Sequence, residues 1–228
     1  MSSTPALKIQ PIKFKKNMAR ATGESKNMRG SVGNIVFYQS KGVTYIRTKP
    51  SRYRDAKTDK QLAARGRFTG CNRYYKLLEP DMLRHVWKMI AERTDKNPKN
   101  LFMQHNFYAF GKDSDITDYG RLQFSAGIIP MPDKLQIRRY NNRDCTVQWE
   151  YNPQEELGSP YDQLYIVELQ ESYRPQIHET GANRSDSEAV FSTYQDICKY
   201  THLYCFWGNE QKTSFSDTLY FKEIPLIE

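Results

Sequence analysis

The four histidines are the first residues to consider for chemistry, because imidazole ligates metals and transfers protons near neutral pH. They are His85, His105, His178 and His202, and none has a second ligand at the spacing of a helical or loop metal site. The sequence therefore predicts no metal site and no cofactor. His105 falls on an aromatic segment, and we interpret it as a core or interface residue.

Patterns for nucleophilic catalysis and calcium binding are also missing. No Ser, Cys or Thr occupies the strand–turn–helix context of a nucleophile elbow. Asp113, Asp115 and Asp118 resemble part of a calcium loop, but the Gly and the terminal Glu that such a loop requires are missing. We interpret these carboxylates as a solvated acidic linker. No catalytic residue is predicted, and we expect a protein that is not an enzyme.

A pattern that can bind phosphate occurs in Arg29-Gly30-Ser31-Val32-Gly33. In one RNA-binding module a GxxG loop between two helices clamps the sugar–phosphate backbone. Here the pattern precedes a predicted strand, which favours glycines that allow a tight entry into a hairpin. The alternative, in which Gly30 and Gly33 present backbone N–H groups to a phosphate, stays open.

Basic residues interleaved with aromatic residues are the strongest functional signal. Arg47 is followed closely by Arg52-Tyr53-Arg54, and Arg73-Tyr74 repeats the combination. Arg with Tyr suits phosphate contacts and base stacking. It equally suits protein interfaces, where both residue types are enriched, so the two alternatives stay open. The predicted partner-binding residues are Lys8, Lys13, Lys15, Lys16, Arg20, Lys26, Arg29, Arg47, Arg52, Tyr53 and Arg54.

Charge is distributed unevenly along the chain. The net charge is +8, but residues 1–100 hold 23 Lys and Arg against 7 Asp and Glu, whereas residues 101–228 hold 11 against 19. Such asymmetry indicates two modules with different surfaces. A basic half attracts polyanions, either nucleic acid or an acidic protein surface, including the acidic half of a neighbouring copy.

The remaining composition indicates a soluble protein. No apolar stretch is long enough to span a bilayer, and residues 1–20 lack the hydrophobic run of a signal peptide. The cysteines have no metal-type spacing, so reduced thiols are expected. We expect a cytoplasmic or virion protein that is not embedded in a membrane.

The segments that position these residues begin with a basic arm, residues 1–28, which has too few apolar residues to order itself alone. We expect either a solvated tail or an arm held by a partner subunit or nucleic acid. Residues 29–38 and 43–50 are β-branched and aromatic runs around a polar turn that ends in Gly42, which predicts a β-hairpin. Period-two geometry places Ile35 and Phe37 on one face, and Val32, Val36 and Tyr38 on the other.

Three helices are expected next. Thr58-x-x-Gln61 is a capping box that opens the first helix. Its predicted buried face consists of Ala64, Phe68, Cys71, Tyr75 and Leu78. The second helix starts at Pro80 and directs inward Leu83, Val86, Trp87 and Ile90. The third starts at Asn97-Pro98 and carries Leu101, Phe102, His105, Phe107, Tyr108 and Phe110, which predicts a central position.

Short strands separated by turn signals are predicted for the C-terminal part, at the spacing of a β-sandwich. They cover residues 121–126, 135–140, 145–151, 163–171, 188–194, 201–208 and 216–223. The break at Ile129-Pro130-Met131-Pro132 lies near the predicted domain boundary. We expect residues 128–228 to fold on their own.

Trp149, Tyr204-x-Phe206 and Ser214-x-Ser216 resemble the pattern of a fibronectin type III or immunoglobulin-like sandwich. In such domains, the positions of Cys145 and Cys205 can carry a disulfide. If Tyr204 and Phe206 face inward, however, Cys205 faces out, so we do not expect this bridge.

A second resemblance covers most of the chain after residue 28. The run Gly30 to Tyr38, together with Lys41-Gly42, Arg47, Pro50, Gln61 and Phe68, is similar to domain-of-unknown-function family 6266, which is common in Bacteroidota. The resemblance continues through Trp149, Tyr204 and residues 216–220, and departs at Gln39-Ser40, where a larger turn is expected. It implies no catalytic residues. Phage-encoded relatives would make a virion protein conceivable.

These observations predict an α+β protein with an N-terminal β-hairpin plus helices and a C-terminal immunoglobulin-like β-sandwich. The predicted domains are an arm (1–28), a hairpin and three-helix module (29–111), a linker (112–132) and the sandwich (133–228). We expect a non-enzymatic structural or adaptor subunit of a larger assembly, such as a phage virion or tail, that docks through its arm and hairpin. The alternative is a nucleic-acid-binding protein that uses the same basic residues.

Overall fold

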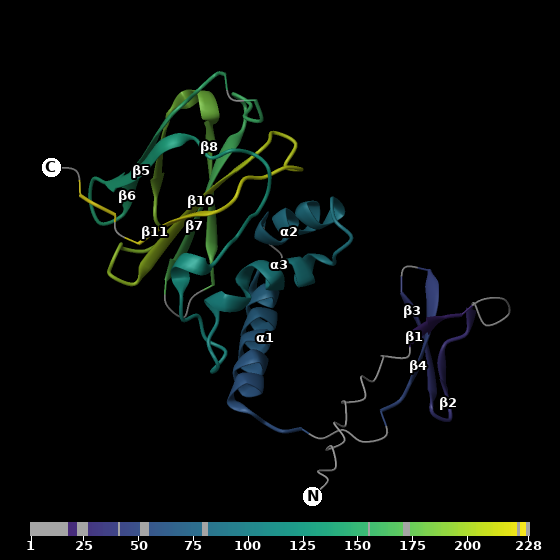
Figure 1. The fold of residues 1–228 in the computed structure, drawn as a ribbon. Coiled ribbons are helices and arrows are strands. Elements are labelled where there is room, and N and C mark those ends of the chain that lie inside the picture. The colour runs from purple at the N-terminus through teal and green to yellow at the C-terminus, as the bar shows by residue number, and fades with distance from the viewer. Residues whose placement is uncertain are drawn as a thin grey trace, which may run out of the picture. The chain divides into compact units, whose positions relative to one another are not determined.

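The computed structural model describes residues 18–21, 27–40, 42–50, 55–78, 82–154, 156–170, 174–222 and 224–226. The chain divides into two compact units, residues 1–56 and residues 57–228. Both are drawn in Figure 1, and each is described by itself below.

The first unit contains a four-stranded antiparallel sheet in the order β1-β4-β3-β2. Its strands are β1 (Met18–Arg20), β2 (Gly30–Val32), β3 (Ile35–Ser40) and β4 (Val43–Thr48). The predicted hairpin is confirmed as β3 and β4, with Gly42 at a φ of 74° in the turn. The end of the predicted arm supplies β1, which pairs with β4.

The run of residues 29–38 is not one strand, because a tight turn at Gly33 and Asn34 divides it into β2 and β3. Gly33 has a φ of 57°, in the left-handed region that favours glycine. Val32 therefore lies opposite Ile35 and shares its face, so its predicted placement with Val36 and Tyr38 is wrong. The turn restarts the period-two alternation of side chains, because β2 and β3 are separate strands.

The second unit starts with the three predicted helices. They are α1 (Asp59–Leu77), α2 (Met82–Glu92) and α3 (Pro98–Asn106). The capping box of α1 is confirmed: the Gln61 backbone N–H donates to Thr58 Oγ1 over 3.3 Å, and the Thr58 N–H donates to Gln61 Oε1 over 3.2 Å. Asn97 caps α3 by accepting from the Lys99 N–H.

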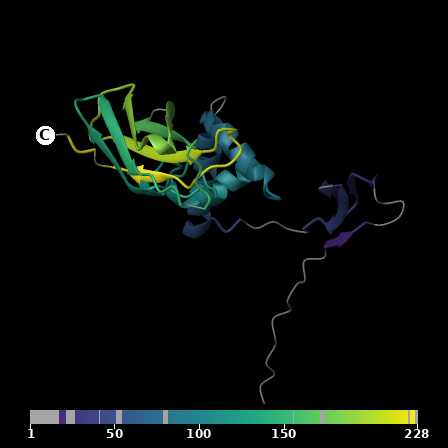
Figure 2. The ribbon, with the colours of Figure 1, turned by 90° about the horizontal axis from the view of Figure 1, so that it is seen from above.

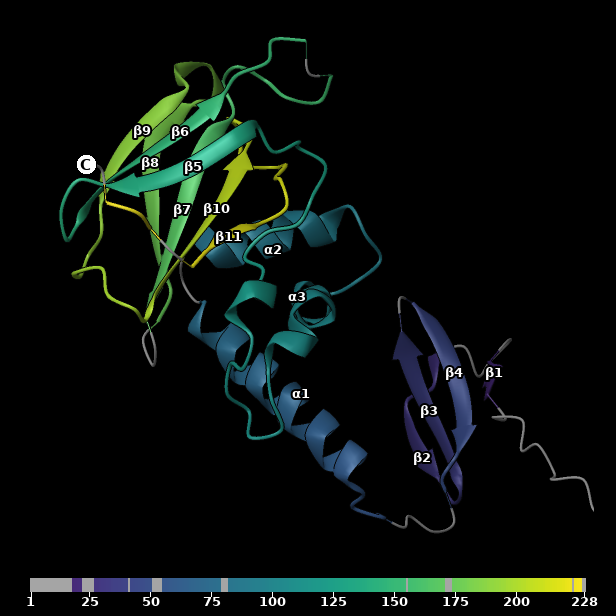
Figure 3. The same ribbon diagram turned by 60° about the vertical axis from the view of Figure 1, so that its left-hand side comes forward.

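A β-sandwich of two antiparallel sheets follows, with the strand orders β5-β6-β9 and β11-β10-β7-β8. The strands are β5 (Asp133–Arg139), β6 (Asp144–Glu150), β7 (Gln163–Gln170), β8 (Gln176–Asn183), β9 (Glu188–Ser192), β10 (Thr201–Gly208) and β11 (Leu219–Phe221). Figure 3 shows the two layers. The α+β fold with an immunoglobulin-like sandwich is confirmed.

Two strand predictions need correction. β8 was missed because its sequence, QIHETGAN, has few apolar residues and contains Gly181 at a φ of 73°. Residues 121–126 form no strand; a short 3-10 helix, Tyr119–Arg121, leads into irregular chain. Leu122 and Phe124 of that chain are nevertheless buried in the core, which accounts for the apolar signal.

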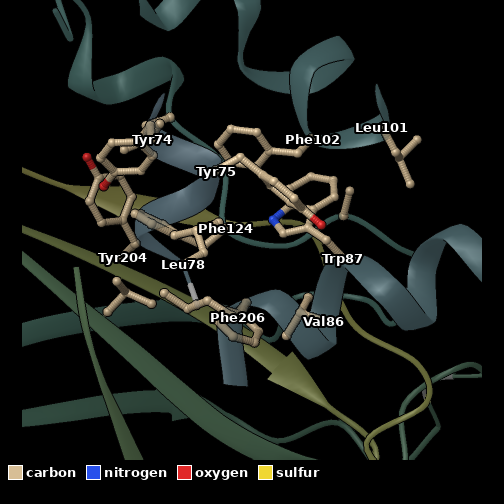
Figure 4. Packing of buried hydrophobic residues seen from close by; sticks show 14 of the residues in the cluster. Tyr74, Tyr75, Leu78, Val86, Trp87, Leu101, Phe102, Phe124, Tyr204 and Phe206 are labelled. Carbon is tan, nitrogen blue, oxygen red and sulfur yellow. The ribbon is translucent and has the colours of Figure 1, made fainter. Parts of the chain in front are cut away.

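The helices pack on the outer face of the β10 and β7 sheet. Figures 2 and 3 show them gathered on one side of the sandwich. Tyr204 and Phe206 of β10 join Trp87 of α2 and Phe102 of α3 in one buried cluster (Figure 4). The helices therefore belong to the unit of the sandwich, whereas the predicted domains grouped them with the hairpin.

The predicted faces of the helices are only partly correct. On α1, Cys71, Tyr75 and Leu78 are buried, but Ala64 is exposed and Phe68 is 54% exposed. No residue of α1 before Gly70 is buried, because the core does not extend to its first half. On α3, Leu101 and Phe102 are buried and His105 is exposed. The helix ends at Asn106, before the predicted Phe107, Tyr108 and Phe110, which lie in or just after a short 3-10 helix (Phe107–Ala109). Tyr108 is exposed and Phe110 is buried, so this segment covers the core from one side only.

The inner core lies between the two sheets and contains Cys145, Leu203, Cys205 and Trp207. Cys205 does point away from Tyr204 and Phe206, but it faces the second sheet and is fully buried rather than exposed. Cys145 and Cys205 are free thiols. Burial raises the pKa of the Cys145 thiol to about 12, so this side chain behaves as a small apolar residue at neutral pH.

Candidate partner-binding surface

Three of the eleven predicted partner-binding residues lie in the described part of the chain: Arg20, Arg29 and Arg47. The others lie outside the described residues: Lys8, Lys13, Lys15, Lys16, Lys26, Arg52, Tyr53 and Arg54. All three described residues belong to the first unit.

The register of the first sheet places two of the arginines on one face. Arg20 of β1 lies opposite Tyr45 of β4, and Tyr45 lies opposite Tyr38 of β3. Arg47 lies two residues from Tyr45 on β4, opposite Val36, which lies two residues from Tyr38 on β3. Because opposite residues share a face and neighbours two apart do so as well, Arg20, Arg47, Tyr38 and Tyr45 form one surface. We call it the basic face.

Aromatic stacking organises the centre of the basic face. The Tyr38 and Tyr45 rings are 5.5 Å apart at an interplanar angle of 23°. Both tyrosines are half-buried, while Arg20 and Arg47 are exposed. Lys49 continues the same face, since its Nζ donates to Ser31 Oγ over 3.3 Å, and Ser31 lies opposite Val36. Arginine guanidinium groups beside an aromatic pair are suited to carboxylates, phosphates and planar rings.

The opposite side of the sheet is apolar, and we call it the apolar face. It carries Val32, Ile35, Phe37 and Ile46, of which Val32 is 73% exposed and Ile35 is 41% exposed. Among the described residues of the first unit, the buried side chains are those of Ala21 and Thr44. The described part of this sheet therefore has almost no core of its own, and such sheets gain stability when a second layer covers them.

Arg29 is separate from the other two arginines. Its Nε donates to Gln39 Oε1 over 2.7 Å, and Gln39 alternates with Phe37 on the side of the apolar face. The GxxG residues are also occupied within the sheet: the Gly33 carbonyl accepts from Lys49 Nζ over 3.1 Å. Gly33 thus serves a turn, as the hairpin interpretation requires.

Arg73 and Tyr74 lie in the other unit and do not combine as a surface pair. Tyr74 is buried, whereas Arg73 is exposed and its Nη2 lies 3.1 Å from Asp115 Oδ1. Another carboxylate of the predicted acidic linker, Asp118, pairs with Arg121. Over the residues that the structure describes, no group of three or more His, Cys, Asp or Glu is arranged to hold a metal ion.

Each histidine contacts a residue from another part of the chain. His178 Nε2 lies 3.2 Å from Glu168 Oε2, His85 contacts the Lys212 carbonyl, and His105 Nδ1 lies 2.9 Å from Gln123 Oε1. His202 Nδ1 lies 2.7 Å from the Tyr220 hydroxyl. Their partners come from distant parts of the chain, which a search by sequence spacing does not detect.

Tyr38, Tyr45 and Lys49 complete the basic face but are missing from the predicted binding residues. For Tyr45 and Lys49, the signal is their alternation with Arg47 along β4 and just past its end at Thr48, which places all three on one side of the sheet. The place of Tyr38 depends on the register of β3 with β4.

The sequence profile of a family of unknown function (DUF6266) matches residues 26–220. No curated protein matches the chain. Among solved structures, the fn3 domain of human contactin 1 is 13% identical, with a TM-score of 0.29, over 46% of this chain and 87% of that chain. A structure described as a myokine is also 13% identical, with a TM-score of 0.28, over 42% of this chain and 99% of that chain. Of the described helices, none is long and apolar enough to cross a membrane.

Proposed function

This chain belongs to the DUF6266 family, and we propose that it is a non-enzymatic structural or adaptor subunit of a larger protein assembly. Its first unit docks on an acidic surface of a neighbouring subunit, and its second unit provides a rigid body. A phage particle is the first assembly in which we would look for it.

The observation that supports this proposal is the basic face on a sheet with almost no core of its own. Residues 1–56 hold 12 Lys and Arg against 2 Asp and Glu, a net charge of +10, whereas residues 57–228 hold 22 against 24, a net charge of −2. Arg and Tyr are the residue types that dominate binding energy at protein interfaces. The apolar face on the other side of the same sheet offers a second contact surface, and a partner that also covers it would supply the missing layer.

The experiment compares self-assembly of the wild type, the triple variant Arg20→Ala/Arg47→Ala/Lys49→Ala, and the variant Lys60→Ala/Lys88→Ala/Lys96→Ala, which removes three exposed lysines of the second unit, as a control for lost charge. If copies dock through the basic face onto acidic surfaces, light scattering at low salt detects oligomers of the wild type and of the control. The triple variant stays monomeric, and 1 M salt dissociates the wild type because exposed charge contacts are screened.

A wild type that is monomeric at low salt and micromolar concentration removes docking between copies. The same two variants then decide whether a different acidic partner, purified with the chain from its native assembly, is held by the basic face. Equal retention of that partner by the triple variant and the control contradicts the proposal.

Nucleic-acid binding is the second candidate, and the stacked pair of Tyr38 and Tyr45, with Arg20 and Arg47 beside Tyr45, favours it specifically. Bases stack on such rings, and each stacked base contributes about 1–3 kcal/mol. Binding to labelled single-stranded DNA or RNA should weaken with salt, at a log–log slope of roughly −0.7 per phosphate contact. A dissociation constant above about 100 μM at physiological salt would be no better than non-specific association.

A further inference from the structure

A pocket of about 540 Å³ lies in the second unit, between α1, the chain around Ile116 and Tyr119, and the end of β7. Its aromatic lining comes from Tyr74, Phe110 and Tyr119, and aliphatic side chains such as Leu169 complete it. Pockets of 300–1,000 Å³ with an apolar lining and a few polar groups are typical of small-molecule sites.

The Tyr74 hydroxyl is the unusual group in this lining. Tyr74 is only 6% exposed, and its hydroxyl oxygen is buried without a hydrogen-bond partner among the residues that the structure describes. Figure 4 shows the hydroxyls of Tyr74 and Tyr204 at the same end of the aromatic cluster. The Tyr204 hydroxyl donates to the Tyr119 carbonyl over 2.9 Å. A buried hydroxyl without a partner destabilises the fold, so such a group needs an explanation.

The Tyr74 hydroxyl can donate a hydrogen bond but has no acceptor among the described residues. Burial, together with the nearby Tyr119, raises the pKa of Tyr74 well above its ordinary value, so the phenol keeps its proton. An oxygen atom of a bound molecule would complete it. The best acceptor is a carboxylate, because hydrogen bonds to an ionised group are about twice as strong as those between neutral groups.

Side chains at the mouth of the pocket can move to admit a molecule. Arg73 is 62% exposed; its Nη2 donates to the Ser114 carbonyl over 2.9 Å and lies 3.1 Å from Asp115 Oδ1. Gln170 is held by two long hydrogen bonds of 3.4 Å. Because the Tyr74 hydroxyl is buried, a bound molecule reaches it only when lining side chains such as Gln170 move, and the guanidinium of Arg73 has further donors for an anion.

We infer that this pocket binds a small aromatic carboxylate. The ring packs between Tyr74, Tyr119 and Leu169, and the carboxylate accepts from the Tyr74 hydroxyl and from Arg73. This site is independent of the basic face and of the proposed docking function.

The test uses the full-length chain and 2-naphthoate, with 2-methylnaphthalene as a probe that has a similar ring and no acceptor. Calorimetry should detect one molecule of 2-naphthoate per chain, bound at least tenfold more tightly than 2-methylnaphthalene. No binding of 2-naphthoate at millimolar concentration, or equal binding of both probes, overturns the inference.

Tyr74→Phe removes only the hydroxyl. We expect 2-naphthoate to bind this variant about tenfold or more weakly, while the Tm without probe stays unchanged or rises, because an unpaired buried hydroxyl is gone. Tyr161→Phe, at a position 64% exposed, is the matched control and should bind as the wild type does. Unchanged binding to Tyr74→Phe, or a lower Tm without probe, shows that the hydroxyl already has a partner and overturns the inference.

A second pair of variants tests the mouth without touching the core. Leu77 lines the pocket and is 42% exposed, so polar substitutions there should leave the fold intact. Leu77→Glu should weaken 2-naphthoate binding more than Leu77→Gln, because only the former repels the carboxylate. Equal effects of the two variants contradict an anionic ligand at this mouth.

Discussion

Arg184 and Asp162 form an ion pair inside the sandwich. Arg184 Nε lies 3.3 Å from Asp162 Oδ2, and the two side chains are 1% and 2% exposed. The Arg184 Nη2 also donates to the Pro130 carbonyl over 2.6 Å, and its guanidinium lies 5.1 Å from the centre of the Trp207 ring. These contacts offset only part of the cost of removing both charges from water, because burial still raises the pKa of Asp162 above its ordinary value despite the nearby Arg184.

Arg184→Ala should therefore lower the free energy of unfolding by about 3–5 kcal/mol, because it leaves the Asp162 carboxylate buried without its cation. Urea denaturation measures the change. Arg138→Ala, at an exposed position of β5, is the control and should change it by less than about 0.5 kcal/mol. A loss below about 1 kcal/mol for Arg184→Ala would mean that water reaches the pair.

Asp144 provides a pH-dependent contact on the surface of the sandwich. Hydrogen bonds from Ser192 (2.5 Å) and Asn141 (2.6 Å) lower its pKa below the ordinary value of 3.8. A lowered folded-state pKa contributes stability above the ordinary value, and this contribution is lost as the pH falls through the folded-state pKa.

The Tm of the wild type should therefore fall more between pH 7 and pH 2.5 than the Tm of Asp144→Asn. Thermal unfolding followed by circular dichroism compares the two. Asp133→Asn, which removes another exposed carboxylate of the sandwich, is the control. Identical pH profiles for the wild type and Asp144→Asn would show that Ser192 and Asn141 do not hold the carboxylate in solution.

The exposure of Arg20 and Arg47 was predictable, but their common face was not. Exposed Arg20 and Arg47 follow from residue type, whereas their placement together depends on the register between β1 and β4. That register joins segments distant in sequence, which a local pattern does not specify.

At the scale of elements, the two halves of α1 differ in burial: only its C-terminal half packs into the core. From Gly70 onward it packs into the core, while its first half has no buried residue. The first half is held locally, by the capping box and by the loop whose Lys112 backbone lies against Gly66. Periodicity is the same along the whole helix, so the sequence could not show where the core ends.

We expect the two helix caps to have different effects. Thr58→Ala should reduce amide-exchange protection over residues 62–66 by about 1 kcal/mol and change the Tm little, because that half-helix can fray alone. Asn97→Ala should instead lower the Tm, because α3 places Leu101 and Phe102 in the core. Hydrogen exchange with thermal unfolding separates the two results, and equal Tm losses would contradict the local role of Thr58.

The strands show which sequence signals are reliable. β6, β7, β9 and β10 contain a concentration of β-branched and aromatic residues that indicates a strand, whereas the sequence of β5, DKLQIRR, gives a weaker signal. The polar strand β8 lacked that concentration, and it is held by pairing with β7. Pairing with a neighbouring strand is a tertiary effect, and it overrides a weak local preference.

At the scale of the whole molecule, the second unit depends on the contact between helices and sandwich. Tyr165 and Val167 of β7, with Tyr204 and Phe206 of β10, lie in the cluster that the helices cover. Each such side chain contributes about 1.5–3 kcal/mol when it is buried. Their sum is comparable with the entire stability of a typical domain, about 5–15 kcal/mol.

The isolated sandwich should therefore not fold, in contrast to the expectation from sequence. A chain of residues 57–228 should show a cooperative thermal transition, whereas a chain of residues 128–228 should melt without one and bind a hydrophobic dye. A cooperative transition of residues 128–228 near the Tm of residues 57–228 would show that the helices contribute little. The sequence indicated the helices and the sandwich correctly, but their shared core depends on how these two parts pack against each other.

The double burial of β10 has a consequence for how this protein can evolve. All eight residues of β10 are buried, because one side meets the helices and the other meets the second sheet, whereas exposed and buried residues alternate along β9. Substitutions in β9 are free to accumulate at every second position without loss of the fold. β10 has no such neutral positions, so mutational drift in this lineage should leave residues 201–208 as an unbroken block of little-changed sequence.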